Sequence, residues 1–274
     1  MREIARHFEI PGVDLLREEL DERVERIRSL KLELKSGVFP SDGTLKRVAK
    51  HLVGGRTKLS YYRCKLTPNL KHLIWKDPLA CFCAGELASR HGIPVLFCVR
   101  NPWAVAASFK RMHWGDAFDN LAQRLPALHA DLPPEDYDAL NASPVEKAGI
   151  LWHAVYRSAL EWTDALNNVY LLDIQSLIER PLETHEQIYA RLGLDFSAKT
   201  ARRIEKLHGK TPGPAVPAER KAHVRRRDLA KANDYWQTLL TGPEIDYVSR
   251  LNGALWQDVQ ARAAAQWAPS GNGR

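Results

Sequence analysis

Cysteines are scarce in this chain of 274 residues, which contains four of them. None belongs to a C-x-x-C pair, and none has a histidine at metal-ligand spacing beside it. We therefore expect buried, reduced thiols rather than a disulfide framework or a metal site. This use of cysteine favours a reducing compartment, so we expect a cytoplasmic protein that needs no metal. The four are Cys64, Cys81, Cys83 and Cys98.

Long apolar runs are missing as well. No stretch approaches the roughly 18 uninterrupted apolar residues of a membrane span, and the first six residues lead into no signal-peptide core. We therefore expect no membrane contact. Since 45% of the residues are hydrophobic, the chain can still bury a full core, and doubly wound α/β domains often reach this length. We expect one domain over residues 1–274, with a mainly helical part over 1–70 and a flexible tail over 267–274.

A phosphate-binding loop of the usual kind is the third absence. Gly209-Lys210-Thr211 imitates the end of a Walker A loop, but that motif needs glycine where the chain has Ile204. The pair Gly54-Gly55 follows a polar helical stretch rather than a buried strand. Neither segment has the strand, loop and helix setting in which backbone amides cradle a phosphate.

Positive charge is present in excess and is concentrated in one segment. The chain has a formal charge of +7, and residues 199–231 hold eleven Lys or Arg against three Asp or Glu, which makes this segment +8 and the remainder −1. Such concentration favours a polyanionic partner. A nucleic acid, a nucleotide with several phosphates and an acidic glycan all satisfy it, and a solvated basic loop is the plain alternative.

Short apolar runs alternate with helical patterns along the chain. Residues 94–99 form a continuous apolar run with a β-branched end, which is typical of a strand buried on both faces of a parallel sheet. The alternation of such runs with helices predicts an α/β fold with a parallel sheet. The expected strands are 73–75, 94–99 and 169–172, and the expected helices are 13–34, 45–52, 78–91, 102–112, 143–166, 181–192, 197–208 and 244–266.

The chain that follows strand 94–99 has the composition of an anion site. Arg100 lies where the strand ends, and ligands gather at the carboxyl edge of open α/β sheets. Asn101 as N-cap, followed by proline, starts a helix whose backbone N–H groups favour negative charge. Ser108, two turns into that helix, can add a hydroxyl donor. Lys76 follows another expected strand and should face the same edge.

Taken in order, these residues resemble the bacterial branch of the sulfotransferases that use 3′-phosphoadenylyl sulfate as donor. The resemblance runs from about residue 70 to about residue 256 and depends on the order and spacing of several short motifs. It implies a three-layer α/β fold with a parallel sheet, like that of P-loop NTPases. The motifs are Lys76-Asp77-Pro78, Arg100-Asn101-Pro102 with Ser108, Trp114, Phe118, Leu151-Trp152, residues 189–194, Tyr235-Trp236, Leu240-Thr241 and Glu244-Ile245.

The resemblance implies a role for each matching position. Lys76 is the candidate catalytic residue, because a flexible ammonium can follow the charge that grows on the leaving oxygen. Arg100 and Ser108 would bind the 3′-phosphate of the donor, with the arginine offering a charge-assisted fork. Arg226 and Arg227 lie in the late basic segment that closes over the donor in this family. The plainer readings are a surface lysine, ordinary exposed arginines and a small residue between helices.

One part of the family pattern is missing from the chain. Sulfotransferases open with a strand and a glycine-rich loop for the 5′-phosphosulfate, and residues 1–70 contain no such segment. We therefore expect the first strand to be absent, either through N-terminal shortening or in a variant without a donor loop. The general base of several relatives lies soon after that loop and is missing with it. His72, His113 and Glu86 are better explained as structural residues, so we name no base.

Three functions are compatible with these patterns. The favoured one is a sulfotransferase that moves a sulfuryl group from 3′-phosphoadenylyl sulfate to a hydroxyl on a carbohydrate or other small acceptor. The second is a non-catalytic protein that binds an adenine nucleotide or a polyanion through the 3′-phosphate half of the site. The third is a nucleic-acid-binding protein that uses residues 199–231, and it ranks last because that segment lacks a recognisable reader motif.

Overall fold

The structure is a computed structural model whose described part is split by several gaps along the chain. It covers residues 2–5, 17–31, 62, 64–76, 80–114, 141–208 and 233–268, and for residues 2–5, 17–19 and 76 the backbone alone. The chain divides into two compact units, Met1–Cys81 and Phe82–Arg274. Of the helices in the described part, none is both long enough and apolar enough to span a membrane.

The unit Met1–Cys81 contains a two-stranded parallel sheet and an amphipathic helix. Strand β1 (Arg2–Ala5) pairs with β2 (Leu73–Lys76) along the full length of both. Helix α1 (Arg17–Arg28) buries one apolar stripe, which confirms the packing face predicted from the spacing. It ends before the predicted residue 34 because Leu30 adopts a left-handed conformation, with a φ of 54°. The buried stripe consists of Leu20, Val24 and Ile27.

The unit Phe82–Arg274 is built around a second parallel pair of strands. Strand β3 (Val95–Val99) pairs with β4 (Val169–Asp173), and Val99 lies opposite Asp173 at the carboxyl end. The prediction of a parallel α/β arrangement is therefore confirmed for these strands. Burial of residues 94–99 on both faces is wrong at Cys98, whose side chain is exposed. Successive side chains alternate between faces, and the better-buried face of β3 is the one that carries Phe97, which stacks on Trp162.

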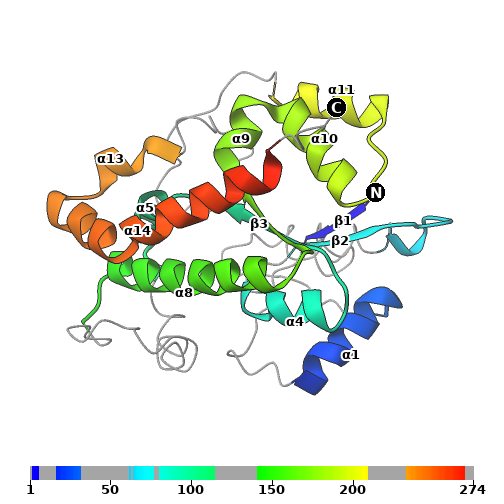
Figure 1. Ribbon diagram of the computed structural model, residues 1–274, viewed down its shortest axis with the longest axis horizontal. Coiled ribbons are helices and arrows are strands. Elements are labelled where there is room, and N and C mark those ends of the chain that lie inside the picture. The colour runs from blue at the N-terminus through cyan, green and yellow to red at the C-terminus, as the bar shows by residue number, and fades with distance from the viewer. Residues whose placement is uncertain are drawn as a thin grey trace, which may run out of the picture. The chain divides into compact units, whose positions relative to one another are not determined.

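Three long helices form the core of this unit, and Figure 1 shows two of them, α8 (Pro144–Ala165) and α14 (Gly242–Trp267), side by side. Both also pack against α5 (Pro102–Met112), whose alanines allow close approach. Gly149 on α8 marks a close contact with α14, because an added Cβ there would lie 3.3 Å from the Tyr247 ring. The tertiary contacts of these helices bury the apolar side chains that their helical spacing predicted.

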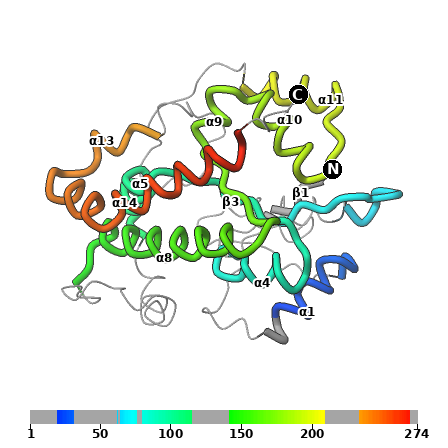
Figure 2. Tube along the Cα trace, in the orientation of Figure 1, coloured from blue at the N-terminus to red at the C-terminus, as the bar shows by residue number. Residues whose placement is uncertain are grey.

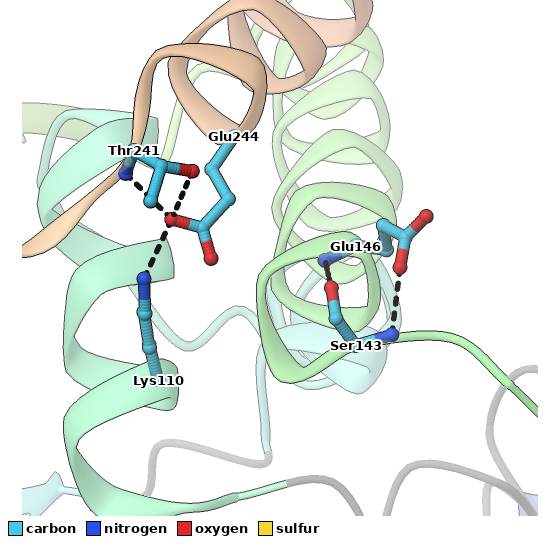
Figure 3. A network of polar contacts seen from close by, with 5 residues as sticks. All are labelled: Lys110, Ser143, Glu146, Thr241 and Glu244. Carbon is cyan, nitrogen blue, oxygen red and sulfur yellow. Dashed lines mark hydrogen bonds and ion pairs between the residues drawn. The ribbon is translucent and has the colours of Figure 1, made fainter.

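Capping residues start both α8 and α14, as Figure 3 shows. The Ser143 hydroxyl accepts from the Glu146 N–H at 3.2 Å, and the Glu146 carboxylate accepts from the Ser143 N–H at 2.6 Å, so the two form a capping box at the predicted start of the helix. At the start of α14 the Glu244 carboxylate accepts from the Thr241 N–H at 2.7 Å and from the Lys110 ammonium at 2.7 Å. Burial alone raises the pKa of Glu244, but the bonds from Lys110 and Thr241 outweigh it and hold that pKa below its usual value.

The lateral edge of β4 is closed by side chains from the end of α14. The Gln266 amide accepts from Leu171 N at 2.8 Å and donates to Val169 O at 3.1 Å, as one residue of a neighbouring parallel strand would. The Trp267 indole N–H adds a bond to Leu171 O at 2.6 Å. Side chains of α14 thus bond to backbone groups of β4 that a further strand would otherwise bond to. This protects the edge from pairing with another chain.

Shorter elements complete this unit, and Figure 2 follows the chain through them. Three helices, α9, α10 and α11, follow β4 and contact one another in sequence. Gly193, with a φ of 64°, stops α10 as predicted. The bounds are η1 (Ala80–Cys83), α4 (Ala84–Ser89), α9 (Ile174–Glu179), α10 (Pro181–Arg191), α11 (Ala198–His208) and α13 (Trp236–Leu239).

Strand β1 lies within residues 1–70, which were expected to be mainly helical and to lack a strand followed by a glycine-rich loop. Its four residues, half of them charged, are too few to show a strand pattern. Of the four cysteines, Cys64 is fully buried, as expected, while Cys81 and Cys83 are partly buried. The described residues do not include four segments about which the sequence made predictions. These are the helix 45–52, most of the chain that precedes Asn141, the basic run 209–231 and the tail beyond residue 268.

Candidate functional site

The chain between β3 and α5 is held rigidly at Arg100. The indole N–H of Trp152 donates to Arg100 O at 2.9 Å. The Tyr156 hydroxyl accepts from Arg100 N and donates to Cys98 O, each at 3.4 Å. Both aromatic side chains are buried on α8, and their rings lie 4.4 Å apart between centroids. Trp152 is therefore a packing residue, and its indole holds the backbone from which the Arg100 side chain extends.

Asn101 caps α5 and also ties it to a distant part of the chain. Its side-chain oxygen accepts from Ala104 N at 2.6 Å, which confirms the predicted N-cap. Its amide group donates to the backbone oxygen of Asn233 at 3.2 Å and to the side-chain oxygen of Asn233 at 3.1 Å. The start of α5 is thus joined to the segment that leads into α13.

Arg100 and Ser108, the two residues expected to share a phosphate, lie in direct contact. The Arg100 Nη1 donates to Ser108 Oγ at 3.1 Å, and both side chains are half-buried. Ser108 Oγ also donates to the helix carbonyl of Ala104 at 2.9 Å. A guanidinium and a hydroxyl are therefore brought together beside the second turn of α5, where both can bond to an anion.

A third side chain, Tyr235, completes this cluster. Its hydroxyl lies 2.5 Å from Ser108 Oγ, and the Arg100 guanidinium lies over its ring at 5.8 Å from the centroid. Tyr235 is 96% buried, since only 4% of its surface is exposed. The buried Arg111, one turn beyond Ser108 on α5, is a further cation that acts on the Tyr235 hydroxyl. We call these four residues, Arg100, Ser108, Arg111 and Tyr235, the hydroxyl cluster.

The pKa of Tyr235 records the positive field of the hydroxyl cluster. Burial by itself raises this pKa, because it disfavours the charged tyrosinate. The bond with Ser108, the Arg100 charge and hydrogen bonds from Arg100 and Arg111 together outweigh burial. The pKa of Tyr235 therefore lies below its usual value, which means that the cluster stabilises negative charge at the Tyr235 oxygen.

Asp173 occupies the carboxyl end of the neighbouring strand. It lies opposite Val99 in the register, one residue before Arg100, and its carboxylate caps α9 by accepting from Gln175 N at 2.9 Å. Burial raises the pKa of Asp173, the Gln175 bond opposes this, and the nearby Glu179 charge raises it further. A carboxyl group with a raised pKa at a sheet edge is a candidate proton acceptor.

The structure brings some of the predicted site residues together and leaves others undescribed. Arg100 and Ser108 meet as expected. The side chain of Lys76, with Asp77, Arg226 and Arg227, lies outside the described residues. Lys76 belongs to the unit Met1–Cys81 and Arg100 to the unit Phe82–Arg274, so their proximity stays a prediction.

Sequence reasoning missed the role of Tyr235 in this cluster. It noted Tyr235-Trp236 as a motif without giving the tyrosine a contact, because 127 positions separate it from Ser108. The adjacent Trp236 stacks on Trp103 at 5.6 Å between centroids, so it packs. Local patterns carry no signal for the Tyr235 contact.

The surroundings of Glu86, His72 and His113 do not mark any of them as a general base. Glu86 forms an ion pair with Arg90 at 2.7 Å on its own helix, and His72 and His113 are exposed. Among the residues that the structure describes, no three His, Cys, Asp or Glu side chains are grouped to hold a metal ion.

Comparisons of the chain with family models, with curated proteins and with solved structures found no match.

Proposed function

We propose that this protein is a sulfotransferase that uses 3′-phosphoadenylyl sulfate and transfers the sulfuryl group to a hydroxyl on a carbohydrate or other small acceptor. The proposal includes the finer fold of that family, a three-layer sheet like that of P-loop NTPases, and a cytoplasmic location in keeping with reduced cysteines. It rests on the resemblance of the ordered motifs together with the geometry of the unit Phe82–Arg274.

The observation that carries the proposal is the contact between Arg100 and Ser108. Eight positions separate them, yet Arg100 Nη1 and Ser108 Oγ lie 3.1 Å apart at the carboxyl end of β3. The resemblance assigns these two side chains to one 3′-phosphate, and such sharing requires them to be neighbours. A surface arginine at a helix start has no need of a hydroxyl two turns along the helix.

The electrostatics of the cluster support an anionic ligand. Arg100 and Arg111 both act on the same buried oxygen, that of Tyr235, and lower its pKa. The same field would stabilise the charge of a phosphate, which accepts charge-assisted hydrogen bonds from guanidinium groups.

In sulfuryl transfer the protein mainly positions the two reactants and stabilises charge, and covalent catalysis is not required. The reaction is an in-line displacement in which charge grows on the leaving oxygen, and side-chain cations can neutralise it without a metal. Lys76 is the proposed cation at the reacting end, because it ends strand β2 as the resemblance requires. The contact between Arg100 and the 3′-phosphate would hold the donor in the orientation that sulfuryl transfer requires.

Calorimetric binding of 3′,5′-adenosine bisphosphate to the full chain tests the phosphate site. Arg100→Ala should weaken binding by about 2 kcal/mol, which is typical of a lost charge-assisted contact. The matched control is Arg191→Ala, which removes an arginine that also stacks on aromatic rings, at 5.1 Å from the Trp267 centroid. The control should leave affinity unchanged, and 5′-AMP, which lacks the 3′-phosphate, should bind weakly and equally to all three proteins.

A turnover assay with 3′-phosphoadenylyl sulfate and a panel of hydroxyl acceptors tests catalysis separately. Transfer that is lost in Lys76→Ala supports the proposed enzyme. Bisphosphate binding without any transfer would favour a non-catalytic nucleotide-binding protein, a function that the missing glycine-rich donor loop also favours. Equal bisphosphate affinity in wild type and Arg100→Ala would remove the phosphate assignment itself.

A further inference from the structure

The hydrogen bonds of Ser108 can be assigned a direction by counting donors and acceptors. Ser108 Oγ has one hydrogen and two lone pairs. The Ala104 carbonyl can only accept, so it takes the Ser108 hydrogen, and the Arg100 guanidinium can only donate, so it takes one lone pair. The Tyr235 hydroxyl, 2.5 Å away, must then donate to the remaining lone pair. All three bonding positions of the Ser108 hydroxyl are therefore in use.

This assignment leaves Tyr235 as the hydroxyl whose hydrogen is free to move to a ligand. Ser108 can donate to a phosphate only by giving up its bond to the carbonyl of Ala104. Tyr235 can turn its hydrogen from Ser108 to a phosphate oxygen without breaking any bond to the backbone. The Tyr235 hydroxyl lies 2.5 Å from Ser108 Oγ, to which Arg100 Nη1 also donates, so a phosphate that contacted both Arg100 and Ser108 would lie within reach of the same hydroxyl.

We propose that Tyr235 is a third hydrogen-bond donor of the phosphate site and that its deprotonated form excludes phosphate from that site. The inference rests on the phosphate site of the proposed function and adds a residue and a pH dependence to it. In the protonated form, the Tyr235 hydroxyl donates to the phosphate beside Arg100 and Ser108. After the proton is lost to solvent, the tyrosinate oxygen takes the guanidinium bonds that the phosphate needs.

The direction of the pH dependence follows from competition for the same cations. Arg100 and Arg111 stabilise the tyrosinate and keep the pKa of Tyr235 below its usual value of about 10. A phosphate beside them repels the tyrosinate, so phosphate binding raises this pKa. By linkage, phosphate affinity falls as the pH rises through the pKa of Tyr235. In Tyr235→Phe this loss of affinity is absent.

Other charged groups also lie on the elements packed around Tyr235. On α5 and α14, Lys110 and Glu244 form an ion pair at 2.7 Å. On α8, Glu146 is bound in the capping box with Ser143, and Lys147 is buried. Tyr235 itself responds to Ser108, Arg100 and Arg111.

The test is the affinity of the full chain for 3′,5′-adenosine bisphosphate at about pH 7 and about pH 9.5, within the range where tyrosine titrates. Wild type should bind more weakly at the higher pH, because part of Tyr235 is then deprotonated. Tyr235→Phe should bind about tenfold more weakly than wild type at pH 7, the usual loss for a hydrogen bond to a charged group, and should show little further loss at pH 9.5. Tyr170→Phe is the matched control and should follow the wild type at both values.

A second measurement, made on the wild-type protein with bound ligand, tests the proposal even if Tyr235→Phe changes the fold. Tyrosinate absorbance, taken as the difference between wild type and Tyr235→Phe during alkaline titration, reports Tyr235 alone. Saturating bisphosphate should shift this difference to higher pH in the wild-type protein.

The outcomes separate this inference from the proposed function. No bisphosphate binding by the wild type overturns both. Binding that is weakened by Arg100→Ala but equal in wild type and Tyr235→Phe at both pH values overturns the role of Tyr235 alone. Tighter binding by Tyr235→Phe at pH 7 would mean that the hydroxyl competes with phosphate and does not donate to it, and this also overturns the inference.

Discussion

Two polar surfaces of the same small sheet are completed in different ways. The lateral edge of β4 is closed by the Gln266 amide and the Trp267 indole. The carboxyl end of β3 is closed by the guanidinium of Arg100 and the hydroxyls of Ser108 and Tyr235. Both sets of side chains satisfy polar groups, but they differ in what can replace them.

The chemistry of the partners explains this difference. At the lateral edge every bond from Gln266 and Trp267 goes to a backbone group that stays in place, so a ligand that displaced them would leave those groups unpaired. At the carboxyl end most bonds join one side chain to another, and hydroxyls can reverse their roles as donor and acceptor. We therefore expect the lateral edge to contribute stability and the carboxyl end to contribute binding.

The largest expected effect on stability is at the lateral edge. Gln266→Ala should lower the free energy of unfolding by about 2 kcal/mol, because it removes two hydrogen bonds to buried backbone groups of β4. Bisphosphate affinity should not change. Denaturant unfolding and calorimetry on the same preparation measure both quantities.

Two variants control for the Gln266 substitution. Gln266→Glu keeps an acceptor for Leu171 N but sets a carboxylate oxygen against Val169 O, so at neutral pH it should be at least as destabilising as Gln266→Ala. Gln260→Ala, at an exposed position of the same helix, should stay within about 0.5 kcal/mol of wild type. A loss of bisphosphate affinity in Gln266→Ala would contradict the division between the two surfaces.

The sequence predicted the carboxyl end better than the lateral edge. The apolar run before Arg100, the Asn-Pro start and the spacing to Ser108 are all local, so the strand, the cap and the residue pair could be predicted from them. Gln266 was assigned only to the end of a helix, since its partners on β4 lie 95 and 97 positions earlier. Contacts over such distances depend on how the helices pack, which no local pattern contains.

The same physical limit explains the other differences between prediction and structure. Tyr235 meets Ser108 across 127 positions, and strand β1 has four residues and too little apolar pattern. The exposure of Cys98 depends on which face of β3 the helices cover. The local elements were right where capping residues or glycines marked their ends, as at Ser143 and Gly193.

An intermediate effect is expected at Asn101, which belongs to the carboxyl end but bonds to backbone. Asn101→Ala should lower the free energy of unfolding by about 1 to 2 kcal/mol, because it removes the cap of α5 and the bonds to Asn233. Asn101→Asp keeps the acceptor for Ala104 N and loses the amide donor, so it should fall between alanine and wild type. Thermal unfolding of the three proteins ranks them, and an aspartate variant as unstable as the alanine variant would mean that the link to Asn233 outweighs the cap.

The smallest effect has the opposite sign and concerns Asp173 at the carboxyl end of β4. Burial, aided by the Glu179 charge and opposed by the Gln175 bond, raises the pKa of Asp173. Its stabilising contribution is therefore present below the unfolded pKa of about 3.9 and is lost as the pH rises through the higher folded value. Asn keeps the cap on Gln175 N without a charge, so Asp173→Asn should stabilise the protein at pH 7 by about 0.5 kcal/mol, and the gain should shrink towards pH 4.

Denaturant unfolding at several pH values measures this difference in stability. If the Asp173 carboxylate lowers stability at neutral pH, its presence is better explained by binding than by folding. A variant Asp173→Asn that is less stable than wild type would instead show that Asp173 stabilises the fold, as Gln266 does.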